Sequence, residues 1–333
     1  MFEKVLSFLD RYESFVLTTH DPPDADGLGT ELVLAAILKN KGKKCRIINA
    51  SPMPLYNRFM DKASIIEIWD DEKHANFAKE SALMVVDTSD EYHLGSMREN
   101  LKKAKEIFII DHHEINPKSK LTGFSDPTAA STSELAIEIA ECLGVSLDCD
   151  TAAAAYAGIV YDTGFFAYTK TTIRTFKAAI KTLEWGADPN STYRQLMENG
   201  SLASILLQKQ ALSKLEFYAD KKIAVMVLCK EDFENSGAAY EDSDSIVNIP
   251  LKAQEVEISM LIKEKPSGEV RCSLRSKGNV NVSKIAQVFN GGGHISAAGL
   301  KSPLNPKETL KKLLNYIEDR QYISVKKTEG ENQ

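Results

Sequence analysis

The chain has 333 residues, of which 43% are hydrophobic and 26% charged, and its formal net charge is -6. This composition is ordinary for a soluble globular protein, and the length favours two domains. The acidic balance excludes a protein that coats nucleic acid nonspecifically, because that mode of binding needs a summed basic field. Five cysteines without a C-x-x-C pair indicate neither a disulfide scaffold nor a thiolate zinc site, and predict a cytoplasmic location.

The first half of the chain alternates strand-like and helix-like segments. Residues 1–15 form an amphipathic pattern with three acids and lack the apolar core of a signal peptide. Short β-rich runs follow, separated by amphipathic or polar stretches, which predicts βαβ units and an α/β domain with a mainly parallel sheet flanked by helices. The predicted strands are SFVLTT (14–19), CRIINA (45–50), LMVVD (83–87) and IFIID (107–111).

The middle of the chain is predicted to be helical. STSELAIEIAECLG begins with Ser131, and Glu134 three residues later completes a capping-box pattern. TAAAAYAGIVYDTG follows, and its apolar part is too short to cross a bilayer. WGADPN then marks a turn, and a long amphipathic stretch follows it. We therefore expect a catalytic domain over 1–188 and a linker helix over 189–220.

The second half predicts a smaller α/β domain with a mixed sheet over 221–325. KIAVMVLC, VEISMLIKEK and EVRCSLRS are strand-like, and PSG between the last two indicates a hairpin. Short helices are expected around Val282 to Asn290 and Pro306 to Asp319. The polar residues 326–333 are expected to be a frayed tail.

Acidic and imidazole side chains follow the predicted strands of the first half. Because the carboxyl ends of parallel strands meet at one edge of a sheet, the fold could bring these residues together. A single Asp at a helix start is most often an N-cap, but capping does not explain adjacent histidines after an apolar strand. A ligand set without thiolates suits manganese or magnesium better than zinc or iron. The candidates are His20, Asp24, Asp26, Asp87, Asp111, His112, His113 and Asp162.

The number of candidate ligands predicts two divalent ions. These candidate ligands are more than a single ion needs. Two ions about 3.5 to 4 Å apart that share one carboxylate would provide coordination positions for them. Such a pair activates a water and clamps the oxygens of an in-line phosphoryl displacement. The expected reaction is therefore phosphoester hydrolysis.

The ordered motifs of the chain resemble a known family. HDPPDADGLGT, VVDTSD, IIDHH and YDTG resemble, in this order, the four motifs of the DHH phosphoesterase superfamily. LRSKG followed by GGGHISAAG resembles its accessory DHHA1 domain. A DHH domain joined to DHHA1 alone is similar to the branch that degrades very short oligoribonucleotides and 3',5'-bisphosphonucleotides. Some members of that branch act on cyclic di-AMP or on its linear product.

The resemblance implies a role for each candidate residue. His113 would face the scissile phosphate, and Asp111 would orient the adjacent histidine or backbone. Asp87 would bridge two divalent ions, for which manganese is expected and magnesium is the alternative. One ion would be held by His20, Asp24 and Asp87, and the other by Asp26, Asp87, His112 and Asp162.

Basic residues and glycines of the second half are candidate substrate ligands. Strand alternation places Arg271 and Arg275 on one face, where a guanidinium suits a terminal phosphate or a base, although a solvated edge strand would look similar. GGGH could open a helix whose N–H groups bind an anion. The resemblance implies that this loop and RSKG bind the far end of the substrate. The predicted residues are Arg271, Arg275, Ser276, Lys277, Gly291, Gly292, Gly293 and His294.

Several residues lie outside this pattern. Ala167 and Ser273 stand where many members of the branch carry basic residues, so the resemblance implies a rearranged grip on the substrate phosphate. Phe165 and Phe166 are predicted to pack in the core rather than to stack on a base. His74 and His93 are expected at the surface.

We therefore expect a metal-dependent phosphodiesterase that hydrolyses short linear oligonucleotides, such as pApA and nanoRNA, to mononucleotides. Removal of phosphate from 3',5'-bisphosphonucleotides such as pAp is a companion activity of the same branch. Hydrolysis of cyclic di-AMP is the main alternative, and pyrophosphate hydrolysis or noncatalytic nucleotide sensing is less favoured. Long duplex nucleic acid and membranes are not expected partners, and a homodimer is kept as a candidate assembly.

Overall fold

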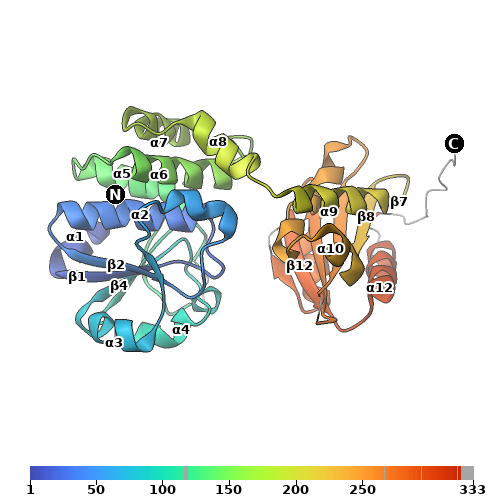
Figure 1. Ribbon diagram of the computed structural model, residues 1–333, viewed down its shortest axis with the longest axis horizontal. Helices are drawn as coiled ribbons and strands as arrows, with labels where there is room; N and C mark the ends of the chain where they lie inside the picture. Colours follow the sequence, from blue (N-terminus) through green and yellow to red (C-terminus); the bar gives the residue numbers. More distant parts are fainter. Residues whose placement is uncertain (116–118, 266, 294, 321, 324–333) are drawn as a thin grey trace. The chain divides into compact units, whose positions relative to one another are not determined.

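The computed structural model describes residues 1–115, 119–265, 267–293, 295–320 and 322–323. The chain divides into two compact units, Met1–Asn199 and Gly200–Gln333, and each has its own sheet (Figure 1). Among the described helices, none combines the length and the apolar character needed to cross a membrane.

The sheet of the first unit consists of six parallel strands in the order β3-β2-β1-β4-β5-β6. The four predicted strands form its centre, and two short strands that we did not predict lie at its edges. The strand order reverses between β1 and β4, which is where parallel α/β sheets bind ligands. The strands are β1 (Ser14–Thr18), β2 (Lys44–Asn49), β3 (Ile66–Ile68), β4 (Ala82–Val86), β5 (Ile107–Asp111) and β6 (Gly123–Ser125).

Both faces of this sheet are covered, which explains the continuous apolar runs of its central strands. On β1, Phe15 and Leu17 belong to one apolar cluster, and Val16 belongs to the cluster on the opposite face. The same alternation on β4 assigns Met84 to the first cluster and Val85 to the second.

Helices form several layers on one face of the sheet and a single layer on the other (Figure 1). α3 and α4 cover one face, whereas α2, then α5 and α6, and finally α7 and α8 cover the other. The middle layers pack closely, because a Cβ at Gly158 would lie only 2.1 Å from the Ser133 hydroxyl. The helices are α1 (Glu3–Arg11), α2 (Ala25–Asn40), α3 (Asp71–Glu80), α4 (Met97–Asn100), α5 (Thr132–Cys142), α6 (Cys149–Asp162), α7 (Ile173–Glu184) and α8 (Pro189–Met197).

The second unit has a mixed sheet in the order β11-β12-β10-β9-β8-β7, in which β8 and β9 are parallel and the other pairs antiparallel. The predicted hairpin joins β9 to β10, and the two predicted short helices are α11 and α12. The elements are α9 (Leu202–Ser213), β7 (Glu216–Tyr218), β8 (Ile223–Leu228), α10 (Lys230–Ser236), β9 (Ile258–Glu264), β10 (Val270–Ser276), α11 (Val282–Val288), β11 (Gly292–Gly293), β12 (Ala297–Ser302) and α12 (Pro306–Asp319).

Two local predictions for this half of the chain are wrong. Residues 189–220 do not form one helix, because α8 ends at Met197 and a new N-cap, Ser201, accepts a hydrogen bond from the Ser204 N–H and starts α9. The residues after GGGH form strand β12 rather than a helix, because they pair along the whole length of β10. The predicted tail, 326–333, lies outside the described residues.

Candidate metal centre

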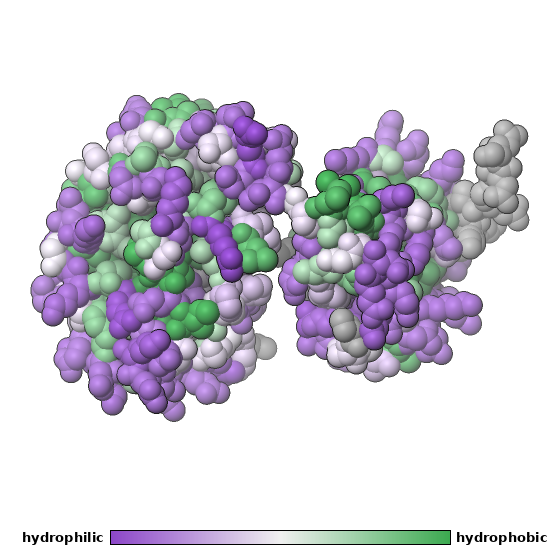
Figure 2. Space-filling model, viewed as in Figure 1, coloured by the Kyte–Doolittle hydropathy of each residue, from purple (hydrophilic) through white to green (hydrophobic). Residues whose placement is uncertain are grey.

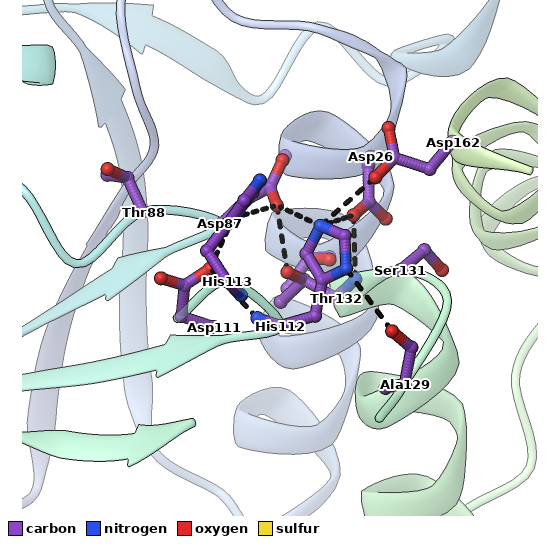
Figure 3. A network of polar contacts seen from close by, with 12 residues as sticks. Asp26, Asp87, Thr88, Asp111, His112, His113, Ala129, Ser131, Thr132 and Asp162 are labelled. Carbon is purple, nitrogen blue, oxygen red and sulfur yellow. Dashed lines mark hydrogen bonds and ion pairs between the residues drawn. The ribbon is translucent and has the colours of Figure 1, made fainter. Parts of the chain in front are cut away.

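The ends of three adjacent strands bring the candidate residues to one edge of the first sheet. His20 follows β1, Asp87 follows β4, and Asp111 ends β5 immediately before His112. The first turn of α2 and the last turn of α6 add carboxylates, and the side chains point toward one another (Figure 3). Ligand atoms within each of three groups lie within 4.8 Å of one another. The groups are His20, Asp24 and Asp87; Asp26, His112 and Asp162; and Asp87, His112 and His113.

Asp87 links these groups. Its Oδ2 lies 3.5 Å from the His20 Nε2, and its Oδ1 lies 3.5 Å from the His112 Nε2. One carboxylate that directs an oxygen to each of two ligand groups has the arrangement of a bridging ligand. Its backbone has a φ of +60°, in the left-handed region that side-chain-bearing residues rarely adopt, and such strain is typical of functional sites.

His112 is oriented as a metal ligand would be. Its Nδ1 lies 3.5 Å from the Ala129 carbonyl oxygen, which can accept a hydrogen bond from a protonated Nδ1. In that tautomer the Nε2 lone pair is left for a cation. In the described part of the chain, Nε2 is buried and has no hydrogen-bond partner, although the Asp162 Oδ2 lies 3.0 Å away. The donor set and this orphaned nitrogen therefore fit a divalent cation.

The electrostatics of the cluster indicate missing positive charge. Burial and the charge of Asp162 raise the pKa of Asp26 to about 6, and burial and Asp26 raise the pKa of Asp87 well above its ordinary range. Burial lowers the pKa of His20 and His112, but the close negatively charged carboxylates outweigh it and raise these pKa values to about 11 and about 10. A bound cation would supply the charge that the cluster lacks.

The two carboxylate oxygens of Asp24 contact different partners. Its Oδ1 accepts hydrogen bonds from the Asp26 and Gly27 N–H groups at 3.0 and 3.1 Å, which caps α2. Its Oδ2 lies 3.4 Å from the His20 Nε2. The N-cap and the metal-ligand interpretations are therefore compatible, because each uses a different oxygen.

Asp111 organises the turn that carries the two histidines. Its buried Oδ1 accepts hydrogen bonds from the His112 and His113 N–H groups at 2.8 and 3.1 Å. The same oxygen lies 2.8 Å from the His113 Nδ1. The His113 side chain is 40% exposed, far more than that of His112, and can therefore meet a substrate.

The start of α5 supports the carboxylates through hydrogen bonds, whereas the residue pattern alone predicted only a helix start there. The Thr132 and Ser133 N–H groups donate to the two oxygens of Asp26 at 2.6 and 2.8 Å, and the Thr132 hydroxyl donates to the Asp87 Oδ1 at 2.8 Å. The capping-box pattern was confirmed as a helix start, with the Ser131 hydroxyl accepting from the Glu134 N–H. That pattern locates the free N–H groups of the helix, but only the tertiary fold identifies the carboxylate that accepts them.

A second missed residue is Lys170. Its Nζ lies 3.4 Å from the His112 carbonyl oxygen, so its ammonium group stands beside the ligand-bearing turn. Ala167, where the family resemblance leads one to expect a basic residue, is exposed and three positions earlier in the chain. Lys170 therefore provides positive charge close to the place where the resemblance implies that it is missing.

In the second unit, the RSKG turn and the glycine-rich loop meet at one end of the sheet. Arg275 is paired in register with Ala297, and the Ser276 N–H donates to the Ser296 carbonyl at 2.9 Å. Arg271 lies elsewhere, because it pairs with Lys301 at the opposite end of β12, roughly 13 Å along the strand.

The predicted substrate ligands of this unit differ in their surroundings. Arg271 donates to Glu269 through Nε at 2.7 Å, and the Lys277 Nζ donates to the Ala253 carbonyl at 2.7 Å. Ser276 is buried, and its hydroxyl donates to the Val280 carbonyl at 2.7 Å. The contacts of these three residues are thus with the protein's own strand and turns.

The three glycines of the loop differ in whether the backbone requires them. A Cβ at Gly291 would lie 2.2 Å from the Gly299 carbonyl oxygen, and Gly293 has a φ of +135°, so both are required by the backbone. At Gly292, no described atom lies within 4 Å of the Cβ position, which leaves room for a ligand to approach the backbone. His294 lies outside the described residues.

Comparison with known proteins places this geometry in a family. The family model of the DHH family N-terminal domain matches residues 14–159, and that of the DHHA1 domain matches residues 220–321. The bifunctional oligoribonuclease and PAP phosphatase NrnA of Thermus thermophilus is 28% identical over 288 residues, which cover 85% of this chain and 82% of the relative.

Two further proteins are similar to this chain over most of its length. The cyclic-di-AMP phosphodiesterase GdpP of Bacillus subtilis is 30% identical over 275 residues, which cover 80% of this chain and 39% of GdpP. The crystal structure of an exopolyphosphatase-related protein of Bacteroides fragilis superposes with a TM-score of 0.88 at 25% identity, covering 95% of this chain and 96% of the other. The chain therefore belongs to the DHH/DHHA1 family, and it is a metal-dependent phosphoesterase.

Proposed function

We propose that this phosphoesterase hydrolyses short linear oligonucleotides, such as pApA and nanoRNA, to mononucleotides and removes phosphate from bisphosphonucleotides such as pAp. The similarity to the NrnA of Thermus thermophilus supports this substrate class. The observation that carries the proposal is the position of Asp87, whose two oxygens each lie 3.5 Å from a histidine nitrogen of a different ligand group. Short RNA fragments arise where RNA is degraded, so the proposed location is the cytoplasm.

The proposed cofactor is a pair of divalent ions, manganese in preference to magnesium. A mixed set of imidazole and carboxylate ligands favours manganese, because magnesium binds oxygen ligands almost exclusively. When bound, such a pair lowers the pKa of a water and neutralises charge on the phosphate oxygens. The ligands would be His20, Asp24 and Asp87 for one ion, and Asp26, Asp87, His112 and Asp162 for the other.

His113 and Asp111 act on the substrate and on the turn, respectively. Hydrolysis forms a bond between phosphorus and a water oxygen, breaks the bond to the ester oxygen of the leaving nucleotide, and delivers a proton to that oxygen. Asp111 holds the His113 Nδ1 at 2.8 Å and thereby fixes the direction of the Nε2 edge of the ring. From this position, His113 stabilises charge on the phosphate or protonates the leaving oxygen.

Basic side chains supply the remaining contacts with phosphate. Lys170 lies beside the His112 turn and is exposed, so it is positioned to attract the phosphate that is cleaved. In the second unit, Arg275 and the backbone at Gly292 are the proposed contacts for the rest of the substrate. The buried or paired residues Ser276 and Arg271 would act less directly, by shaping the turn and the strand.

Hydrolysis of cyclic di-AMP is the second candidate function. It is favoured by the similarity to GdpP, which is named for that activity. Both candidates use the same ligands and the same His113, so they differ only in how the substrate enters the site.

The decisive experiment compares three substrates on one preparation. Linear pApA, cyclic di-AMP and pAp are incubated with enzyme that has been treated with chelator and then supplied with manganese or magnesium. We expect fast hydrolysis of pApA and pAp, no turnover after chelation, and recovery with manganese. Hydrolysis of cyclic di-AMP alone would select the alternative. Persistent hydrolysis by the His112→Ala variant would contradict the metal assignment.

A further inference from the structure

Arg174, in the first turn of α7, contacts three carboxylates. Its Nε and Nη2 each donate to one oxygen of Glu138 at 2.6 Å, which makes a bidentate pair. Its Nη1 donates to the Asp126 Oδ2 at 2.6 Å. Its Nε also lies 3.3 Å from the Oε1 of Glu134, which is fully buried. The guanidinium therefore joins α7 to α5 and to the turn that precedes α5.

Two of these acids lie at opposite ends of one segment, residues 126–134, which includes the start of α5. At one end, the Asp126 N–H donates to the Asp111 carbonyl oxygen at 3.0 Å, next to the turn that carries the two histidines. At the other end, Glu134 lies in the first turn of α5, where its side chain is enclosed by the protein. Arg174 therefore holds both ends of the segment at once.

The middle of this segment contacts the metal centre. The Ala129 carbonyl oxygen lies 3.5 Å from the His112 Nδ1. Thr132 donates through its N–H to Asp26 and through its hydroxyl to Asp87. Hydrogen bonds weaken steeply as their geometry departs from the optimum, so the support that these groups give to the ligands depends on where the segment lies.

We propose that Arg174 is a positioning residue for the metal centre. By holding residues 126–134 at both ends, it fixes the carbonyl, N–H and hydroxyl groups that orient the imidazole and carboxylate ligands. Loss of groups that orient metal ligands typically lowers metal affinity or activity by about 10- to 100-fold. This role rests on the proposed set of metal ligands, and it adds to them a residue from α7, a helix that carries none of them.

Arginine is suited to this position. Its planar fork binds both oxygens of Glu138 and leaves Nη1 for Asp126, whereas a lysine ammonium is a point charge and cannot match this geometry. Without the guanidinium, the three carboxylates would lose the cation that they share. Repulsion between them, and the buried position of Glu134, would then favour a displacement of the segment.

The same helix offers a matched control. Lys181 of α7 is 29% exposed and Arg174 is 23% exposed, and the two lie on the same side of the helix because they are seven residues apart. The outer face of α7 is apolar, with Ile173 and Ile180 exposed at the top of the first unit (Figure 2). The Lys181 Nζ lies 3.8 Å from Glu141, near the end of α5 that is farther from the metal centre. Both cations thus connect α7 to α5, but Arg174 also reaches the segment that supports the ligands.

The first test measures manganese binding to the full chain by titration calorimetry, after treatment with chelator. We expect Arg174→Gln to weaken manganese binding by about 10-fold or more, and Lys181→Gln to change it by less than about twofold. Arg174→Lys keeps the charge but not the fork, so it should restore part of the affinity. Urea unfolding in chelator measures the stability of each variant without metal, which separates a loss of affinity from a loss of folded protein.

The second test asks whether Arg174 acts through the segment. If it does, Asp126→Asn should weaken manganese binding in the unmodified chain but have a much smaller effect when Arg174→Gln is already present. A double-mutant cycle on manganese affinity would measure this coupling. The control cycle combines Lys181→Gln with Glu141→Gln and should show no coupling in manganese affinity.

Three outcomes would overturn the proposal and leave the ligand assignment intact. They are an unchanged manganese affinity in Arg174→Gln, an equal loss of affinity in Lys181→Gln, and effects of Arg174→Gln and Asp126→Asn that simply add. If Arg174→Gln does not fold, Arg174→Lys replaces it, and an unchanged affinity in that variant would also overturn the proposal. An unmodified chain that binds no manganese would overturn both the proposal and the ligand assignment.

Discussion

The edge of the first sheet and the end of the second sheet use their polar residues differently. At the first edge, Asp26, Asp87 and His112 are almost fully buried and held in place by one another and by the start of α5. At the second, the partly exposed Arg275 donates to the Leu274 carbonyl oxygen through Nη1 at 3.0 Å, and the backbone at Gly292 is open. The first region is buried and braced by its own hydrogen bonds, whereas the second presents a partly exposed guanidinium and an open stretch of backbone to a ligand. Substitutions in the first should therefore lower kcat, and substitutions in the second should raise KM.

The largest effect should come from Asp87→Asn. This change keeps the shape of the side chain but removes the negative charge shared by both ligand groups. We expect kcat for pApA with manganese to fall by about 10³-fold or more, because loss of a bound ion costs several kcal/mol of transition-state stabilisation. Steady-state kinetics with quantified mononucleotide release would measure it.

The matched control for that variant is Asp61→Asn. Asp61 is another buried carboxylate, but it accepts hydrogen bonds from the Ile65 and Ile66 N–H groups outside the cluster. It should lower the free energy of unfolding while kcat stays nearly unchanged. In chelator, Asp87→Asn should be at least as stable as the unmodified chain, since burial and Asp26 already disfavour the Asp87 charge. Equal loss of activity in both variants would contradict the contrast between the two regions.

A smaller effect is expected for Thr132→Val. Valine has the shape of threonine but cannot donate the hydrogen bond to the Asp87 Oδ1, while the backbone bond to Asp26 is retained. Loss of a group that orients a ligand typically lowers metal affinity or activity by about 10- to 100-fold. Titration calorimetry with manganese and kinetics should both detect it. Thr132→Ser, which keeps the hydroxyl, should behave like the unmodified chain, and weak binding in both variants would indicate a packing defect instead.

The second sheet should respond to Arg275→Ala with a change in KM. A charge-assisted hydrogen bond from a half-exposed guanidinium would account for about a tenfold increase in KM for pApA. kcat should change by no more than about twofold, because the metal centre belongs to the other unit. Arg271→Ala is the control, since Arg271 is paired with Glu269 at the other end of the strand. A fall in kcat without a change in KM would break the contrast.

The same two regions differ in how far sequence could predict them. The apolar runs of β1, β4 and β5 were recognisable because these strands are buried on both faces. Asp87 and His112 follow β4 and β5 directly, and His20 lies two residues after the end of β1. Parallel pairing then brings the residues to one edge, so their proximity followed from the order of elements. The start of the strand after GGGH was less predictable, because small residues such as Ala297 and Ala298 suit a helix equally well and only pairing with β10 selects the strand.

Other errors have the same physical origin. His74 was expected at the surface because its neighbours in sequence are polar, yet it is 1% exposed and its Nε2 lies 3.2 Å from Glu67. β3 and β6 are only three residues long, and such short edge strands have little periodicity to detect. The contact of Lys170 with His112 also depends on tertiary structure, because the two residues lie 58 positions apart. Contacts between distant segments were predictable only where the topology itself required them.

A buried acid outside the metal cluster provides a comparison for the carboxylates inside it. Glu31 of α2 is fully buried, and its Oε2 accepts a hydrogen bond from Asn49 at 3.0 Å. In the described part of the chain, its Oε1 has no hydrogen-bond partner. Burial raises the pKa of Glu31 to about 8, so near neutral pH it is largely protonated in the folded state. Unlike Asp24, Asp26, Asp87 and Asp162, it lies in none of the three groups whose ligand atoms are close enough together to hold a metal ion.

The smallest effect on hydrolysis, and a distinct effect on stability, is therefore expected for Glu31→Gln. Because the folded-state pKa is raised, the stability due to protonated Glu31 is fully present below its ordinary value of 4.5 and is lost as pH rises to about 8. Each pH unit in that interval costs the unmodified chain up to about 1.4 kcal/mol, whereas glutamine does not titrate. Urea unfolding in chelator at pH 5, 6.5 and 8 should show Glu31→Gln gaining stability relative to the unmodified chain as pH increases. A difference that does not change with pH would show that Glu31 ionises in the folded state as readily as in the unfolded chain, and a large loss of kcat would place it in the catalytic region after all.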